Sequence, residues 1–314
     1  MDNYLTDLIS RLSDRSDWGI IKNSGDSISF KAHREAEKIT DSGYIPQLIG
    51  YIEVEKKKER RDSAYFILGK IAKNLQDEKV AEFLINRIPE EKNENILSSM
   101  LDRLADLPKP ACLDLTLLLD ATRDKRRYVR WSAISALDNT NNPKAEDRLI
   151  EILQNPEDDY DLTRANATLS RIGSSKSLPH LEKLITYKIM DVAYSALNAM
   201  VEIADESYLP LFVKQLTKGK LKSVAIEGVV RYGREDVIPV VIKRIKELVA
   251  KQRKYQTIIH KGQTDLMVGM EFLVTYSKDY KYIRDLYNIL TTKKSGLLFD
   301  IEKEWLESHS EMFI

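Results

Sequence analysis

The chain has 314 residues, enough for one large domain, two ordinary domains or an elongated array of repeats. Its 49 lysines and arginines balance 49 aspartates and glutamates, so the net charge favours neither a nucleic acid nor a membrane as partner, and any charge bias must be local. With only 12 glycines and 9 prolines, a β-sandwich or a disordered chain is disfavoured. The composition therefore favours helices, and the all-α fold that we predict rests on the repeats described below.

The N-terminus, MDNYLTDLISRLSDRS, is acidic and lacks the basic and apolar regions of a signal peptide. No apolar run approaches the roughly 20 residues needed to span a bilayer. We therefore expect a cytoplasmic protein without a membrane partner. The single cysteine, Cys112, excludes an internal disulfide and lies in an apolar, helix-like stretch, which predicts a buried thiol.

One short pattern recurs along the chain, an aliphatic residue followed by a proline and an apolar helix. It occurs at 44–52, 177–185, 208–216 and 237–245. An apolar residue stands ten positions before each proline, and a small residue stands four positions before that one. These two positions lie on one face of a helix, and proline is favoured in the first turn of a helix. The pattern thus predicts a helical hairpin whose second helix begins at the proline.

The same helical face recurs in stretches that lack the proline. Together they give eight apolar anchors, at positions 36, 68, 101, 137, 169, 200, 229 and 273. Successive anchors are 29 to 36 residues apart, except for the last interval of 44 residues. A period near 32 residues with two helices per unit is typical of an α-solenoid. We expect about eight hairpins over 30–290, an N-terminal capping segment over 1–29 and a C-terminal capping helix over 291–314.

The segment VRWSAISALDNTNNPKAEDRLIEIL at 129–153 carries a Val-Arg pair, small residues and a leucine in the pattern of a HEAT repeat, and LTRANATLSRIGSSKSLPHLEKLI at 162–185 matches nearly as well. The chain therefore resembles the HEAT-repeat family, in particular the short bacterial type first noted in phycobilin lyases. The resemblance spans about 30–290 and implies an α-solenoid. It implies little about function, because the repeat is a structural unit. A single globular helical bundle is the alternative, but a bundle does not require a constant ten-residue offset.

Residues suited to catalysis or metal binding are not grouped in the sequence. No HExxH motif or close His/Cys cluster is formed by the histidines, which are His33, His180, His260 and His309. The stretch AHREAEKI at 32–39 superficially resembles the His-Glu motifs of deoxyhypusine hydroxylase, an iron enzyme on the same repeat, but Arg34 interrupts the only pair. We therefore expect no cofactor, no metal and no catalytic activity.

Charge is distributed unevenly along the chain. Between 214 and 261 there are thirteen basic residues against four acidic ones, whereas 146–161 is strongly acidic. The helix after Pro239 should turn Lys243 and Lys246 towards solvent, and it either continues past Leu248 or opens into a basic loop. These features predict a charged concave groove that binds a protein of complementary charge. The residues expected to contact this partner are Lys243, Arg244, Lys246, Lys251, Arg253, Lys254, Glu151 and His180.

Two functions remain open. The first is a non-catalytic protein-binding scaffold, adaptor or inhibitor; bacterial immunity proteins sometimes use such repeats, so a toxin is one partner of this class. The second is nucleic-acid binding, by resemblance to HEAT-like alkylpurine DNA glycosylases, which Tyr128, Arg130, Trp131 and the basic run at 123–127 would support. Neutral net charge and an acidic stretch near the basic one favour a protein partner. Trp131 also occupies a helical position typical of packing against the next repeat.

Overall fold

The computed structural model describes residues 1–17, 19–259 and 262–313. These residues form α-helices joined by turns and short 3-10 segments, with no β-sheet in this described part. The chain divides into two compact units, residues 1–180 and 181–314. None of the described helices combines the length and apolarity needed to cross a membrane.

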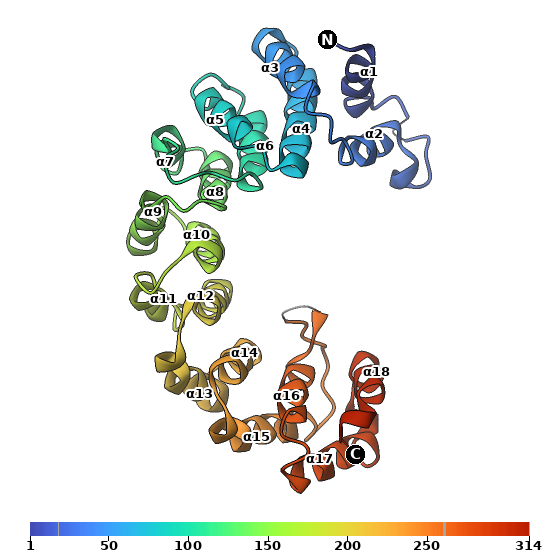
Figure 1. The fold of residues 1–314 in the computed structure, drawn as a ribbon, viewed down its shortest axis with the longest axis vertical. Helices are drawn as coiled ribbons and strands as arrows, with labels where there is room; N and C mark the ends of the chain where they lie inside the picture. Colours follow the sequence, from blue (N-terminus) through green and yellow to red (C-terminus); the bar gives the residue numbers. More distant parts are fainter. Residues whose placement is uncertain (18, 260–261, 314) are drawn as a thin grey trace. The chain divides into compact units, whose positions relative to one another are not determined.

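The first unit begins with α1 (Asn3–Leu12), and paired helices follow. The pairs are α2 (Ile28–Ala36) with α3 (Tyr44–Val54), α4 (Lys58–Leu75) with α5 (Glu78–Arg87), α6 (Glu94–Ala105) with α7 (Thr116–Ala121), and α8 (Arg127–Ala136) with α9 (Pro143–Gln154). The next pair is α10 (Asp159–Ile172) with α11 (Leu178–Leu184), and α11 contains the boundary between the units. Within this unit, α4, α6, α8 and α10 form one layer, while α3, α5, α7 and α9 form the other (Figure 1).

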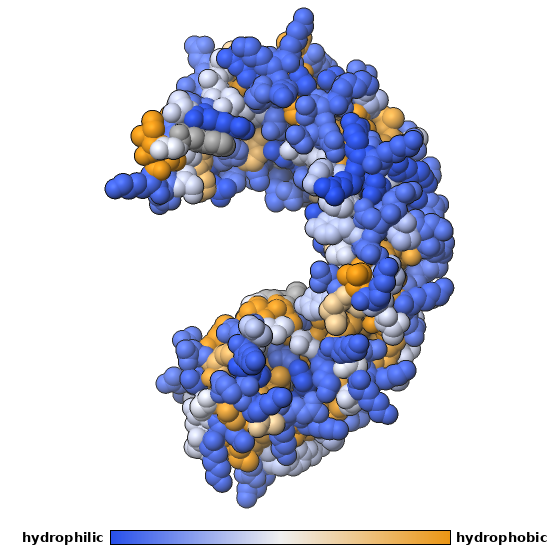
Figure 2. Space-filling model, turned by 180° about the vertical axis from the view of Figure 1, so that it is seen from behind, coloured by the Kyte–Doolittle hydropathy of each residue, from blue (hydrophilic) through white to orange (hydrophobic). Residues whose placement is uncertain are grey.

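The second unit repeats the same arrangement. Its pairs are α12 (Met190–Ile203) with α13 (Leu209–Lys218), α14 (Lys222–Tyr232) with α15 (Ile238–Leu248), and α16 (Asp265–Val274) with α17 (Lys281–Thr291), followed by α18 (Asp300–Ser308). Short 3-10 segments are Ser24–Asp26, Glu206–Tyr208, Glu235–Val237, Ser295–Leu297 and Ser310–Phe313. In both units the face seen in Figure 2 is mostly hydrophilic, with separate apolar patches. The chain is thus built as an all-α solenoid of paired helices.

The predicted anchors form the core of the repeats. All are fully buried, at 0% exposure: Ala36, Leu68, Leu101, Leu137, Leu169, Met200, Val229 and Leu273. Each lies in the first helix of its pair or directly at the end of that helix. The four prolines stand at the second or third residue of α3, α11, α13 and α15, as predicted. The hairpin register read from the sequence is therefore confirmed.

Buried ion pairs join consecutive repeats. Arg61 of α4 donates to Glu91, 2.7 Å away, and Arg130 of α8 donates to Asp161 of α10, 3.0 Å away. The paired residues are 30 and 31 positions apart, about one repeat. Both carboxylates are almost fully buried, so the pairs stabilise the stacking only because their charges are matched.

The prediction of a buried Cys112 is wrong. Its side chain is exposed, because the residues around it form a turn and α7 begins only at Thr116. Pro108 and Pro110 precede it and supply no N–H groups, which opposes a continuous helix in this stretch. The helix that the apolar pattern predicts around Cys112 therefore begins later in the chain, at Thr116.

Candidate interaction surfaces

The basic residues predicted to bind a partner fall into two groups. Lys243 and Lys246 are exposed on α15, as expected from their position on the helix. Because α15 ends at Leu248, the chain opens into an irregular segment, in which Lys251 and Lys254 are also exposed. Of the two alternatives for this helix, the structure has the basic loop. Among the basic residues of the predicted site, these four lysines are the exposed ones.

The two arginines of the predicted site are occupied within the chain. Arg244 donates to Asp265 at the start of α16, 2.6 Å away, and its side chain is only 14% exposed. Arg253 donates to Glu302 of α18, 2.8 Å away, and its guanidinium lies 4.5 Å from the centre of the Phe299 ring. The Glu302 side chain is fully buried. Both arginines therefore hold helices of the second unit together, which the sequence pattern did not indicate.

Glu151 and His180 belong to the first unit, not to the unit that carries the basic residues. Glu151 is exposed and accepts hydrogen bonds from Arg123 and Arg148, at 3.0 and 2.9 Å. His180 is half-buried, and its Nδ1 lies 3.2 Å from the Gln154 amide nitrogen. No site inside one unit can therefore contain these two residues together with Lys243 or Lys246.

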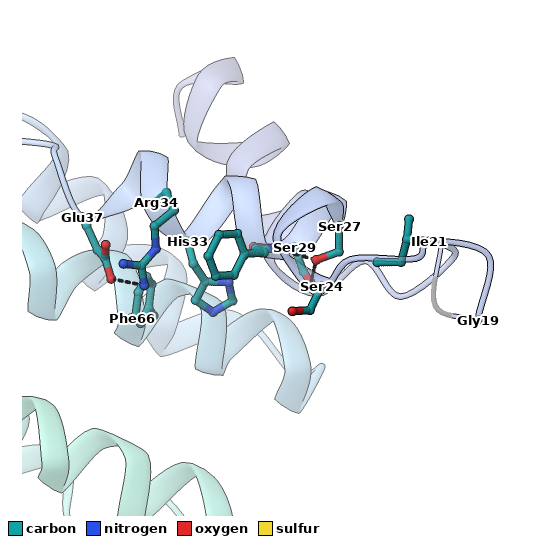
Figure 3. Close-up of a pocket in the computed structure, with 10 residues that line it drawn as sticks. Gly19, Ile21, Ser24, Ser27, Ser29, His33, Arg34, Glu37 and Phe66 are labelled. Carbon is teal, nitrogen blue, oxygen red and sulfur yellow. Dashed lines mark hydrogen bonds and ion pairs between the residues drawn. The ribbon is translucent and has the colours of Figure 1, made fainter.

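A cavity of about 660 Å³ lies beside α2 in the first unit (Figure 3). Its histidine, His33, is held by its Nδ1 at 2.6 Å from the Ser29 carbonyl and by edge-on contact with Phe66. Arg34 is paired with Glu37, 2.8 Å away. Among the residues that the structure describes, no three His, Cys, Asp or Glu side chains are grouped so that they could hold a metal ion. His260 lies outside the described residues.

Aromatic and arginine side chains, three of them exposed and two half-buried, gather where α8 meets α10. We call this set the aromatic–arginine cluster; it consists of Arg127, Tyr128, Trp131, Tyr160 and Arg164. The Trp131 ring is centred 5.4 Å from Tyr128 and 4.4 Å from Tyr160. Arg127 lies over Tyr128 at 4.8 Å and Arg164 over Tyr160 at 5.2 Å. The two tyrosines remain 48% and 46% exposed, so the rings are packed together and still open to solvent.

The repeat itself positions this cluster. Tyr128 and Tyr160 stand nine residues before the anchors Leu137 and Leu169, at equivalent positions of neighbouring repeats. Beneath them the buried Arg130 donates to Asp158, 2.7 Å away, as well as to Asp161. The expectation that Arg130 supports nucleic-acid contact is therefore wrong, because its donors join two repeats.

Trp131 contacts the next repeat, as predicted, through Tyr160 and through its Nε1, which lies 3.4 Å from an Asp158 carboxylate oxygen. The sequence singled out Tyr128 and Trp131 but missed Tyr160 and Arg164. The repeat period was the available signal, since it places Tyr160 one unit after Tyr128. Asp158 also caps the N-terminus of α10, where its side chain accepts from the backbone N–H groups of Tyr160 and Asp161.

Paired helices with a regularly spaced buried anchor define a helical-repeat protein. Residues 113–189, which contain the whole cluster, match the family model for HEAT repeats. Over 98% of its length the chain is similar to the structure "Crystal structure of Kap121p bound to Nup53p", with a TM-score of 0.61 and 12% identity. The chain spans 40% of the length of that protein, and at this identity the likeness concerns the fold alone. A comparison with curated proteins finds no match.

Proposed function

We propose that this protein is a non-catalytic scaffold that binds another protein through the aromatic–arginine cluster. The carrying observation is that the cluster's packed aromatic rings, flanked by two arginines, remain accessible on neighbouring first helices. The few residues that carry most of the binding energy at protein interfaces are enriched in tyrosine, tryptophan and arginine. Packing in the protein core does not explain the presence of Tyr128 and Tyr160, because about half of each side chain faces solvent.

The cluster is also held in a fixed arrangement before any partner binds. Ring contacts orient Trp131, and the Arg127 guanidinium donates to the Tyr128 hydroxyl, 2.9 Å away. Arg164 donates to Ser135, 3.3 Å away. Side chains that are already ordered lose less conformational entropy on binding. The arrangement thus favours recognition of a protein surface with apolar and acidic groups.

We extend the proposal to the predicted charged residues. The exposed Lys243, Lys246, Lys251 and Lys254 would accelerate association with an acidic partner surface, and Glu151 would meet a basic one. His180 would contact the partner as a polar side chain. More specifically, we propose that the protein is an adaptor, or an immunity-type inhibitor that wraps a toxin in the bacterial cytoplasm. We also propose that its repeats are related to the phycobilin-lyase type. These more specific proposals rest on analogy with other helical-repeat proteins.

Capture of partners from the native cell extract tests the proposal. Three baits are compared by quantitative mass spectrometry: the wild type, Trp131→Ala/Tyr160→Ala, and Tyr255→Ala as a control at a tyrosine that is 83% exposed in the second unit. Circular dichroism verifies that each bait is folded. We expect one protein to be enriched by the wild type and the control and lost with the double variant. Equal enrichment by all three baits would contradict a role for the cluster.

Nucleic-acid binding is the second candidate, because aromatic rings that are open to solvent and lie beside arginines can also stack with unpaired bases. Beneath the cluster, Asp158 and Asp161 carry two negative charges against the single positive charge of Arg130, which disfavours phosphate binding there. Fluorescence anisotropy with single- and double-stranded DNA across a salt titration decides between the two candidates. Strong salt-dependent binding that Trp131→Ala abolishes would favour the nucleic acid.

A further inference from the structure

A hollow of about 330 Å³ lies in the second unit, between the turn before α12 and the C-terminal end of α13. Its walls are apolar, formed by Ile185, Met190, Ala193 and Leu221. Met190 is 52% exposed although it is a large apolar residue at the start of a helix. An exposed apolar surface with a polar rim is typical of an interaction site.

The rim of this hollow is basic. It carries the exposed Lys188, Lys214, Lys218 and Lys220, whereas no aspartate or glutamate is among the described residues that line the hollow. None of these four ammonium groups forms an ion pair with another residue of the described chain. Four like charges around one hollow repel each other, so an anionic group placed among them is favoured. The chain as a whole is neutral, so this excess of positive charge is local.

The repeat register extends the basic rim along the second helices. Lys183, Lys214 and Lys243 each stand four residues after the proline of their helix, and all three are exposed. Helices α13 and α15 pack directly against each other. The row therefore continues from the hollow onto α15, where Lys246 is also exposed. A repeated lysine at one register position suits an extended ligand better than a compact one.

We propose that this hollow binds a short acidic segment of a partner protein, with one apolar side chain seated between Met190 and Leu221 and carboxylates facing the lysine rim. Charge complementarity and the apolar walls together select this occupant. A nucleic acid would leave the apolar walls unused, and the described lining of the hollow contains no arginine that could hold a phosphate by two donors. The site needs no residue of the aromatic–arginine cluster, so it stands independently of the function proposed above.

A labelled peptide tests the site on the full chain. The probe is a fluorescein-labelled peptide with one leucine flanked by glutamates, and its binding is measured by anisotropy at low salt. Two further peptides carry serine for the leucine or glutamine for the glutamates, and a labelled oligothymidine provides the nucleic-acid probe. The charge variant is Lys218→Glu/Lys220→Glu. The matched control is Lys281→Glu/Lys293→Glu, which reverses two other exposed lysines of the same unit.

We expect the charge variant to weaken binding of the leucine peptide by about tenfold or more and the control by less than about twofold. Met190→Ser and the serine peptide should each weaken binding by about threefold or more, because the apolar contact is lost. Trp131→Ala/Tyr160→Ala should bind the peptide as the wild type does.

Equal losses in the charge variant and the control would overturn the proposal, since they would indicate unspecific attraction. Tighter binding of oligothymidine than of the leucine peptide would overturn it in favour of a nucleic acid. Loss of peptide binding in Trp131→Ala/Tyr160→Ala would also overturn it, because the site would then not be independent of the cluster.

Discussion

Leu169 shows how single side chains hold the array together. It is fully buried in α10 and occupies the anchor position of its repeat. Shortening it to alanine removes apolar contacts and leaves a cavity. We expect Leu169→Ala to lower the free energy of unfolding by about 2–5 kcal/mol. Chemical unfolding measures this change, and a loss below about 0.5 kcal/mol would mean that the position tolerates truncation as an exposed residue does.

The neighbours Lys243 and Arg244 should respond very differently to charge reversal. Arg244→Glu removes the positive partner of the buried Asp265 and places a second carboxylate against it. This change should lower the free energy of unfolding by about 3–5 kcal/mol. Lys243→Glu changes an exposed side chain and should cost less than about 1 kcal/mol. Unfolding curves of the two variants provide the measurement. Similar losses in both would show that Arg244 has no structural role.

Lys109 is a charged residue type placed almost entirely inside the protein, with 2% of it exposed. Its Nζ donates to the carbonyl oxygens of Leu104 and Leu107 at the end of α6, at 2.8 and 2.7 Å. Burial lowers the pKa of Lys109 to about 7, and the nearby Asp138 and Asp106 only partly oppose this effect. The folded chain therefore releases this proton far below the usual pKa of lysine.

This pKa predicts how stability depends on pH. Between the folded pKa of about 7 and the unfolded pKa of about 10.4, the unfolded chain binds one more proton at Lys109 than the folded chain does. Its contribution to stability is thus fully present above the unfolded pKa and is lost as pH falls towards 7. Stability of the wild type relative to Lys109→Met should rise from pH 7 to pH 10. A constant difference across this range, measured by chemical unfolding, would contradict the prediction.

At the scale of helices, much of the fold could be predicted and the role of the charged residues could not. Apolar spacing and proline position depend on neighbours within one turn, so the anchors and the start of α13 and α15 were visible in the sequence. The partners of Arg244 and Arg253 lie 21 and 49 residues away. No local pattern reports such a contact. The basic run therefore predicted a binding site, but its two arginines, Arg244 and Arg253, connect helices within the second unit.

The attachment of α18 illustrates such a distant contact. Its Glu302 accepts hydrogen bonds from Arg253 and from the Thr264 hydroxyl, 2.7 Å away, and it is fully buried. Glu302→Gln should loosen this connection, because the charge that holds Arg253 is lost. We expect faster hydrogen exchange in α18 but not in α4 to α10, since a repeat array is stabilised by neighbouring units.

The matched control for this change is Glu304→Gln, which alters an exposed glutamate of the same helix. It should leave exchange in α18 unchanged. Hydrogen exchange followed by mass spectrometry resolves the helices separately. Unchanged protection of α18 in Glu302→Gln would show that the ion pair is not what attaches it.

At the scale of the whole molecule, folding and binding rest on different residues. The buried anchors and matched ion pairs account for the two units, while the aromatic–arginine cluster lies in the first unit and the basic hollow in the second. The sequence identified Tyr128 and Trp131 as unusual but could not show that the tyrosine rings stay open to solvent. That property depends on how α8 meets α10. Substitutions in the cluster should therefore change binding more than stability.

The affinity of the captured partner for purified variants tests the central claim directly. Isothermal titration calorimetry is performed with the wild type, Trp131→Ala and the control Tyr255→Ala. If Trp131 is a central contact, its removal should cost about 2 kcal/mol or more of binding free energy, which raises the dissociation constant by about thirtyfold. The dissociation constant of the control should stay within about twofold of the wild-type value. An affinity of Trp131→Ala equal to that of the wild type, with the variant folded, would contradict binding through the aromatic–arginine cluster.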